Sequence, residues 1–127
     1  MRRGEDCPCV RETATLESCY EAILAAPRRA GAAAIVDEAG KLVGIVTHGD
    51  FFRLLTAKEP PAGRRIAEVM TLNPKRIGRD ARVVDALEVM RKHAIDELPV
   101  VDAEDRVVGL IDIQDMIARG FSVFDAP

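Results

Sequence analysis

Two short stretches of the chain place an oxygen-bearing side chain three residues before an aspartate. Thr47 precedes Asp50, and Asp112 precedes Asp115. Each stretch follows an apolar, β-branched run, so the first side chain is expected at the end of a strand and the aspartate on the first turn of a helix. An ionised carboxylate accepts charge-assisted hydrogen bonds from the adjacent hydroxyls of a ribose, and a threonine hydroxyl donates or accepts beside it. The pattern favours a site for a sugar-bearing small molecule.

The alternative for the first pair is a structural role, in which Asp50 caps its helix and Thr47 ends its strand. Capping contributes about 1 kcal/mol to stability and is compatible with ligand binding. It therefore does not decide between the two interpretations.

The second pair differs because Asp112 stands where Thr47 stands in the first. Two carboxylates in one cleft repel an approaching phosphate, and burial favours the protonated form of one of them. They would still hold ribose hydroxyls, or a cation that bridges to phosphate. We therefore rank the cleft with Asp112 and Asp115 second, and a solvated acidic helix cap is its alternative.

A bound phosphate would need positive charge or oriented backbone N–H groups, and basic residues gather at two turns of the chain. They are Lys75, Arg76, Arg79 and Arg82 in the second half, and Arg28 and Arg29 in the first. We assign Lys75 and Arg76 to the candidate site, together with His48, which lies inside the first pair. For each of these side chains a solvated surface position is the alternative. His93 is expected to face the dipole at the end of a helix.

The two pairs belong to an internal repeat. Residues 35–50 (IVDEAGKLVGIVTHGD) return as residues 100–115 (VVDAEDRVVGLIDIQD), so that Asp50 and Asp115 are 65 positions apart. A repeat of this length cannot bury its apolar face alone, and the two copies are expected to pack against each other. The site is therefore expected in the clefts between them.

Each copy is predicted to form a strand or extended lead-in, a helix, two strands and a closing helix. Thr15 caps a helix that Pro27 ends, and hydrophobic spacing predicts another long helix from Asp80 or Ala81. The other predicted elements are strands at 32–36, 42–47, 98–101 and 107–112, helices from Asp50 and over 115–119 with Gly120 as its stop, a helical turn at 66–70, and a short strand within 75–78.

The composition fits one compact domain. The 127 residues are 48% hydrophobic, and the net charge of −3 argues against electrostatic binding of nucleic acid. The apolar runs are too short to span a bilayer and the start does not resemble a signal peptide, so we expect a soluble cytoplasmic domain. Cys7, Cys9 and Cys19 suit neither a disulfide framework nor a zinc site, because Cys7 and Cys9 lack C-x-x-C spacing. We expect no metal and no catalytic residue.

The repeated residues resemble a tandem pair of cystathionine-β-synthase (CBS) domains, often called a Bateman module. The residues that carry the resemblance are 98–102 (LPVVD), 107–111 (VVGLI) and Asp115 in the second copy, and 34–37, 42–46 and 47–50 (THGD) in the first. The resemblance implies an α+β fold of two pseudo-symmetric β-α-β-β-α repeats packed through their sheets. The expected boundaries are 1–56 for the first repeat, 57–65 for a Pro-rich linker and 66–127 for the second repeat. It also implies that Thr47 and Asp50 hold the ribose of a nucleotide.

A narrower resemblance joins the chain to the C-terminal half of arabinose-5-phosphate isomerases. It rests on residues 1–6 (MRRGED), 47–50, 66–71 (IAEVMT) and 111–115 (IDIQD). It implies a regulatory module without catalysis of its own, attached to an upstream sugar isomerase domain, assembled as a homodimer and bound to an adenine or cytidine nucleotide or a sugar nucleotide. Two alternatives stay open: a CBS pair of another enzyme or a transporter, and an assembly module with vestigial clefts, joined through Phe51, Leu55, Met116 and Ile117.

Overall fold

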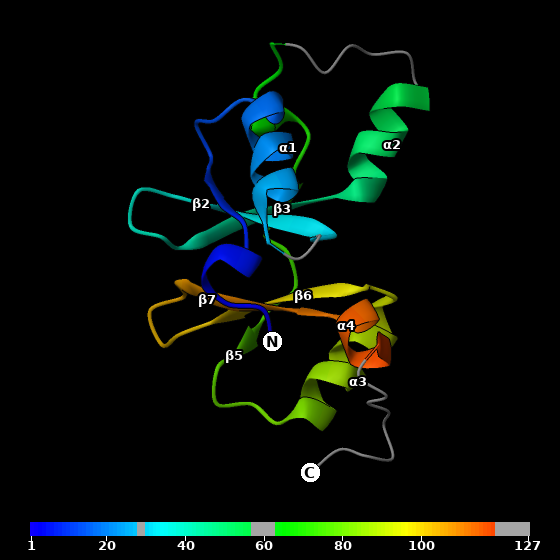
Figure 1. Ribbon diagram of the computed structural model, residues 1–127. Helices are drawn as coiled ribbons and strands as arrows, with labels where there is room; N and C mark the ends of the chain where they lie inside the picture. Colours follow the sequence, from blue (N-terminus) through cyan, green and yellow to red (C-terminus); the bar gives the residue numbers. More distant parts are fainter. Residues whose placement is uncertain (28–29, 57–62, 119–127) are drawn as a thin grey trace.

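Two β-sheets lie face to face at the centre of the molecule, with two helices on the outer side of each (Figure 1). This computed structural model describes residues 1–27, 30–56 and 63–118. None of the helices in that part of the chain has the length and apolar character needed to cross a membrane. The elements in chain order, with η for a 3-10 helix, are η1 (Gly4–Asp6), β1 (Cys9–Arg11), α1 (Leu16–Ala25), β2 (Ala32–Val36), β3 (Leu42–Thr47), α2 (His48–Thr56), η2 (Ile66–Glu68), β4 (Thr71–Leu72), β5 (Ile77–Gly78), α3 (Val83–His93), β6 (Glu97–Val101), β7 (Val107–Asp112) and α4 (Ile113–Ala118).

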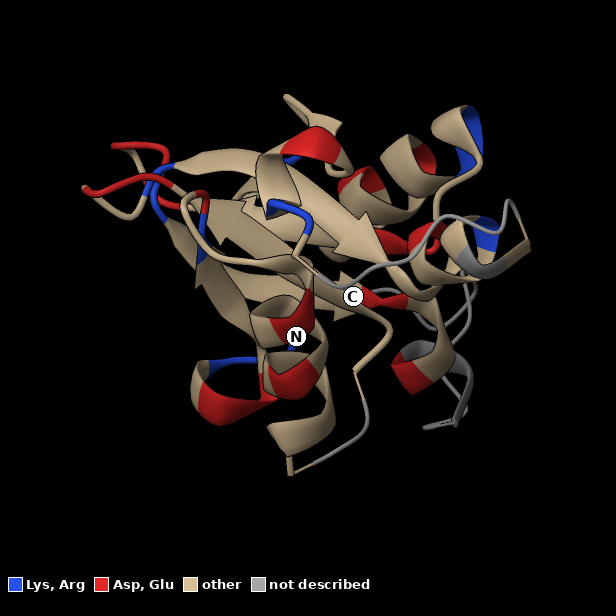
Figure 2. Cartoon of the chain, turned by 90° about the horizontal axis from the view of Figure 1, so that it is seen from above, with Lys and Arg blue, Asp and Glu red and all other residues tan. Residues whose placement is uncertain are grey.

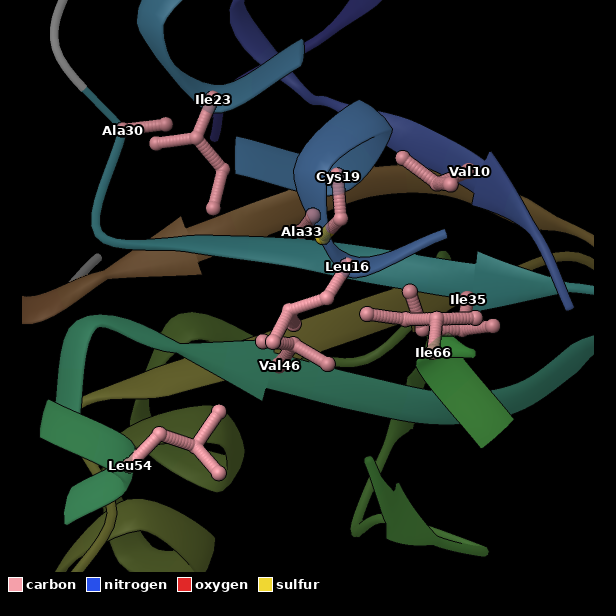
Figure 3. Packing of buried hydrophobic residues seen from close by; sticks show 10 residues of the cluster. All are labelled: Val10, Leu16, Cys19, Ile23, Ala30, Ala33, Ile35, Val46, Leu54 and Ile66. Atoms are coloured by element: carbon pink, nitrogen blue, oxygen red, sulfur yellow. The ribbon is translucent and has the colours of Figure 1, made fainter. Parts of the chain in front are cut away.

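Helix α1 covers the first sheet because its apolar residues recur on one side. The Thr15 hydroxyl accepts a hydrogen bond from the Ser18 amide at 3.2 Å, which confirms the predicted N-cap. Leu16, Cys19 and Ile23 follow at helical spacing, and all three are buried. Figure 3 shows this side of the helix meeting the residues of the first sheet.

Strand β2 is buried on both faces, which explains its run of small and apolar residues. Alternate residues of a strand point to opposite faces. Ala33 and Ile35 belong to the core under α1, whereas Ala32 and Ala34 face the second sheet. Ala32 packs against Leu110 of β7, and the small alanine side chains let the two sheets approach closely.

The two sheets share one order of strands. β1 pairs with β2 in parallel and β2 with β3 antiparallel, and β5, β6 and β7 repeat this arrangement. Each sheet also receives a segment from the start of the other repeat. Thr71 of β4 pairs with Ile45 of β3, and Arg2 pairs with Leu110 of β7. This confirms the predicted α+β fold of two pseudo-symmetric repeats packed through their sheets.

Glycine is required where these crossing segments lie on the sheets. A Cβ atom at Gly44 would lie 2.5 Å from Sδ of Met70, and one at Gly109 would lie 2.8 Å from the carbonyl oxygen of Arg2 and against the Met1 sulfur. A side chain at position 109 would push the crossing backbone away from the sheet, and one at position 44 would displace the Met70 side chain. The two glycines and the two methionines therefore occupy equivalent positions in the two repeats.

Three helix boundaries differ from the sequence prediction. Helix α2 begins before Asp50, so that Asp50 lies in the first turn and accepts a hydrogen bond from the Thr47 amide instead of being the cap residue itself. Helix α3 begins later than expected, where the Asp85 carboxylate accepts from the Arg82 amide at 3.3 Å and fixes the first turn. Helix α4 begins earlier, at Ile113. Outside the described residues lie the predicted stop at Gly120 and most of the linker, 57–62.

Substitution of Leu98 tests the packing of the core in the second repeat. Its side chain is fully buried beside Ala86 and Met90. We expect Leu98→Ala to lower the free energy of unfolding by about 2–5 kcal/mol, because it removes buried methyl groups and leaves a cavity. Urea unfolding followed by circular dichroism measures the loss. Leu72→Ala, at a side chain that is 69% exposed, is the control and should change stability by less than about 0.5 kcal/mol. Equal losses in the two variants would contradict this description of the core.

Glu97 lies at the junction between the repeats, at the start of β6. Its Oε1 atom would be 2.6 Å from a Cβ atom added at Gly31, so the carboxyl group sits directly against the backbone of the first repeat. Burial, followed by the negative charges of Asp112, Asp96 and Asp50, raises the pKa of Glu97 to about 7. The folded chain therefore keeps a proton here that the unfolded chain releases near pH 4.5.

The contribution of Glu97 to stability is expected to fall as the pH rises from about 4.5 to about 7. In this window the folded chain binds more protons than the unfolded chain, so the free energy of unfolding decreases with pH. The contribution is fully present below the window and lost above it. Glu97→Gln should remove this dependence, a change on the order of 1 kcal/mol because solvent still reaches the half-buried group.

Urea unfolding at about pH 5 and about pH 8 measures this difference in wild type and variant. Glu88→Gln, at an exposed carboxylate on α3, should keep the wild-type pH dependence. If the free energy of unfolding changes equally between the two pH values in Glu97→Gln and in wild type, the raised pKa of Glu97 is wrong.

Candidate functional site

The stretch from Asp112 to Asp115 opens into a cavity of about 390 Å³, which we call the second-repeat cavity. Strand β7 ends at Asp112, and helix α4 carries Asp115 in its first turn, as the spacing predicts. The remaining walls come from the N-terminal segment, β5, α3 and β6. The cavity thus collects residues from both ends of the chain.

Hydrogen bonds hold both carboxylates in place. Oδ1 of Asp112 accepts from the Gln114 amide at 2.8 Å, which caps α4, and the side chain is 5% exposed. Asp115 is held by Arg2, whose Nε and Nη2 donate to its two carboxylate oxygens at 2.7 and 3.1 Å. Arg2 Nε also lies 4.0 Å from Asp112 Oδ2, so one guanidinium offsets the repulsion between the two carboxylates. Each oxygen retains a further lone pair with which it can accept a hydrogen bond.

The other walls of the second-repeat cavity divide into an apolar and a basic part. The apolar part is formed by Ile77, Val83, Ala86, Val100 and Ile111, and the basic part by Arg3, Arg79 and Arg82. Carboxylates bind hydroxyl groups, the apolar part packs against a ring, and guanidinium groups bind anions. The cavity can therefore hold a molecule that combines hydroxyls, an apolar ring and an anionic group.

In the first repeat, the aspartate is engaged by its near neighbours in sequence, at the end of β3 and in α2. Oδ2 of Asp50 accepts from the Thr47 amide at 2.8 Å and from the Thr47 hydroxyl at 3.3 Å. Its Oδ1 forms an ion pair with Arg53 in the next turn of α2. The side chains of Thr47 and Asp50 meet, as their spacing predicts. Asp50 contacts Thr47 and Arg53, however, instead of pointing its carboxylate into an open cleft.

Thr47 and His48 line a wider hollow of about 690 Å³ between the repeats, which we call the junction hollow. Glu97, Asp112 and Asp115 are among the residues of its other side, so acidic groups predominate there. This charge disfavours a bound anion. The sequence ranks the first-repeat cleft ahead of the second, whereas the structure places the smaller, more enclosed and partly basic cavity in the second repeat.

The structure does not bring Lys75 and Arg76 to either hollow. Arg76 turns toward the hairpin turn of the second repeat, where its Nη1 donates to Asp105 at 2.7 Å and to the Leu42 carbonyl at 3.3 Å. Lys75 is exposed. Figure 2 shows acidic and basic residues side by side at the two hairpin turns, in keeping with a charge pair there. The basic groups of the cavity are the three arginines named above.

Arg2 and Arg3 are the site residues that sequence reasoning missed, because residues 1–6 entered it only through the resemblance to the isomerases. The available signal was the equivalence of the start of the chain with Met70 and Thr71 at the start of the second repeat. Of the other predicted residues, His93 is exposed in the last turn of α3, where a helix dipole favours a cation. Arg28 and Arg29 lie outside the described residues.

Within residues 1–27, 30–56 and 63–118, no three His, Cys, Asp or Glu side chains are grouped so that they could hold a metal ion. The three cysteines are free thiols, of which Cys7 and Cys19 are buried and Cys9 is exposed. A hydrogen bond between the thiols of Cys7 and Cys9 raises the pKa of Cys7 and lowers that of Cys9. Burial raises the pKa of Cys19 to about 12. Cys9 is therefore the more acidic thiol of its pair.

Comparison with known proteins places this geometry in a family. The model of the CBS domain matches residues 1–57 and, separately, 66–121. The chain is 36% identical over 117 residues to arabinose 5-phosphate isomerase KdsD of Francisella tularensis, an alignment that covers 92% of this chain and 35% of that protein. It is 35% identical over 85 residues to inosine-5'-monophosphate dehydrogenase of Methanocaldococcus jannaschii, covering 67% of this chain and 16% of that protein.

Among solved structures, the chain resembles the CBS domain pair of protein MJ0100 in complex with 5'-methylthioadenosine and S-adenosyl-L-methionine. The TM-score is 0.77 at 29% identity, and the match covers 92% of this chain and 89% of that one. The chain spans about a third of the length of the isomerase relative, so the likeness to that enzyme concerns one part of it. Because both halves match separately and pack as in other CBS pairs, the chain belongs to the CBS domain family as a tandem pair, a regulatory module with no catalytic activity of its own.

Proposed function

We propose that this CBS pair binds a nucleotide or sugar nucleotide in the second-repeat cavity and thereby regulates an attached arabinose 5-phosphate isomerase in the cytoplasm. The observation that carries the proposal is the pair of oriented carboxylates, the buried Asp112 and the partly exposed Asp115, at one end of a cavity of about 390 Å³. That volume lies in the range of small-molecule sites, which is roughly 300–1,000 Å³.

The three kinds of wall favour a nucleotide over a simple sugar. Ribose hydroxyls would donate to the carboxylates, and a base would pack against side chains such as Ile77 and Val100. Phosphate oxygens would accept from Arg79 or Arg82 at the start of α3. A free sugar phosphate would leave the apolar wall in contact with water, which lowers the expected affinity.

The relatives support this assignment. A solved CBS pair at 29% identity holds 5'-methylthioadenosine and S-adenosyl-L-methionine, which are both adenosine derivatives. The isomerase relative aligns with 92% of this chain, which supports an isomerase as the regulated partner. The ligand shifts the relative packing of the repeats, or of two such pairs in a homodimer, only by its different affinity for the two states. A cytidine sugar nucleotide is one candidate effector.

Isothermal titration of the chain with AMP, ATP, CMP and the cytidine sugar nucleotide CMP-Kdo tests the proposal. We expect at least one of the four to bind with a dissociation constant below the millimolar range. Asp115→Asn should raise that constant about tenfold or more, since the loss of a charge-assisted hydrogen bond costs roughly 1.5–3 kcal/mol.

Glu88→Gln is the matched control, because it neutralises an exposed carboxylate on α3 that accepts hydrogen bonds from Arg91. Its dissociation constant should equal that of wild type. Binding of none of the four ligands at millimolar concentration would overturn the proposed function. Equal binding by Asp115→Asn and wild type would move the site away from the second-repeat cavity.

The second candidate is an assembly module, and exposed apolar side chains favour it. Phe52 on α2 is 66% exposed, and Leu24 on α1 is 56% exposed. Of the residues expected from the sequence, Phe51 is half-buried against Tyr20, with the ring centroids 5.3 Å apart. The side chains of Leu55, Met116 and Ile117 lie outside the described part of the structure. This function becomes the preferred one if no nucleotide binds.

A further inference from the structure

Arg2 is a buried arginine that reaches the second-repeat site from the other end of the chain. Its backbone pairs with Leu110 at the edge of β7, with N–O distances of 2.7 and 2.9 Å. Its side chain is 4% exposed and binds both carboxylate oxygens of Asp115. The contact therefore joins residues 2 and 115 and depends on the pairing of the first residues with β7.

The carboxylates of Asp112 and Asp115 form a wall between two spaces. Both line the second-repeat cavity, and both also line the junction hollow, where Arg2 lies. Met1 and Arg3, the neighbours of Arg2, line the cavity instead. Alternate residues of an extended segment point in opposite directions, which accounts for this arrangement. Arg2 thus holds Asp115 from the side opposite to the cavity.

The first repeat is built differently at the equivalent place. Thr71 pairs with Ile45 as Arg2 pairs with Leu110, but the cation beside Asp50 is Arg53 of the same helix. The Arg53 side chain is 71% exposed, whereas that of Arg2 is buried. Among the described residues, Asp115 of the second repeat thus receives its cation from a segment distant in the sequence, whereas Asp50 of the first repeat does not.

We propose that Arg2 is a positioning residue for the second-repeat site, and that ligand binding there and the pairing of Met1–Arg3 with β7 strengthen each other. This rests on the proposed nucleotide binding and deepens it. The guanidinium fixes the orientation of Asp115 and offsets the charge of the carboxylates of Asp112 and Asp115, so that their free lone pairs face the cavity. Because coupling of binding equilibria is reciprocal, a ligand that uses the fixed Asp115 must also stabilise the paired segment. Occupancy of the cavity is thereby communicated to the N-terminal segment.

The test combines titration with hydrogen exchange on the full chain, using AMP, ATP, CMP and CMP-Kdo as probes. We expect Arg2→Met to raise the dissociation constant of the bound probe about tenfold, and Arg2→Lys, which cannot form the bidentate pair, to fall in between. The double variant Arg2→Met/Asp115→Asn should bind only slightly more weakly than Asp115→Asn alone, since Arg2 acts chiefly through Asp115 and lies farther, at 4.0 Å, from Asp112. Arg11→Met, at an exposed arginine of β1, is the control and should bind like wild type.

Hydrogen exchange supplies a readout that a purely structural role would not move. The Leu110 amide donates to the Arg2 carbonyl at 2.9 Å, so its exchange reports the pairing of the segment. The probe should slow this exchange in wild type and leave it unchanged in Arg2→Met. If Arg2→Met is poorly folded, the binding of Arg2→Lys and the exchange experiment on wild type decide whether Arg2 is a positioning residue.

The outcomes separate the two proposals. If wild type binds none of the probes, the proposed function is overturned and this inference with it. If wild type binds a probe and Arg2→Met or Arg2→Lys binds it equally well, or if the probe does not change exchange at Leu110, this inference alone is overturned.

Discussion

The close face-to-face packing of the two sheets is the constraint on which the site depends. Alanines at 32 and 34 keep the layer between the sheets thin. β3 and β7 end on the same side of the molecule, where α2 and α4 begin (Figure 1). The junction hollow consequently draws residues from both repeats, including Thr47 and Asp112. With the sheets further apart, the carboxylates of the second repeat would be ordinary solvated helix caps, and hydroxyl groups would bind them little better than water does.

Charge compensation distinguishes the two repeats more than their folds do. Asp50 is engaged locally, by Thr47 at the end of β3 and by Arg53 in α2, and these contacts involve only residues 47–53. Asp115 depends on Arg2, which a strand-like pairing carries across to the other repeat. The aspartates of the two repeats are thus held in different ways, one by its near neighbours in sequence and the other by a distant segment. The repeat that departs from the threonine-aspartate pattern is the one whose carboxylates stand in the wall of the enclosed cavity.

The sequence predicts most of the fold because each local preference agrees with the tertiary structure. The cap at Thr15, the two hairpins and the repeat period all appear as expected. The boundary of α3 shifts because the interaction of Asp85 with the Arg82 amide decides it, which composition alone does not reveal. The site is only partly predictable. The spacing finds Asp112 and Asp115, but the roles of Arg2 and Arg76 depend on which segments cross between the sheets, and no local pattern encodes that.

The most direct test of the central claim is a map of backbone amide chemical shifts by NMR as AMP, ATP, CMP or CMP-Kdo is added to the chain. If a nucleotide binds in the second-repeat cavity, the largest changes should fall on amides around it, such as Gly78, Val83 and Asp112. Changes centred on the first-repeat residues Thr47 to Asp50, or the absence of changes with all four nucleotides, would contradict the account.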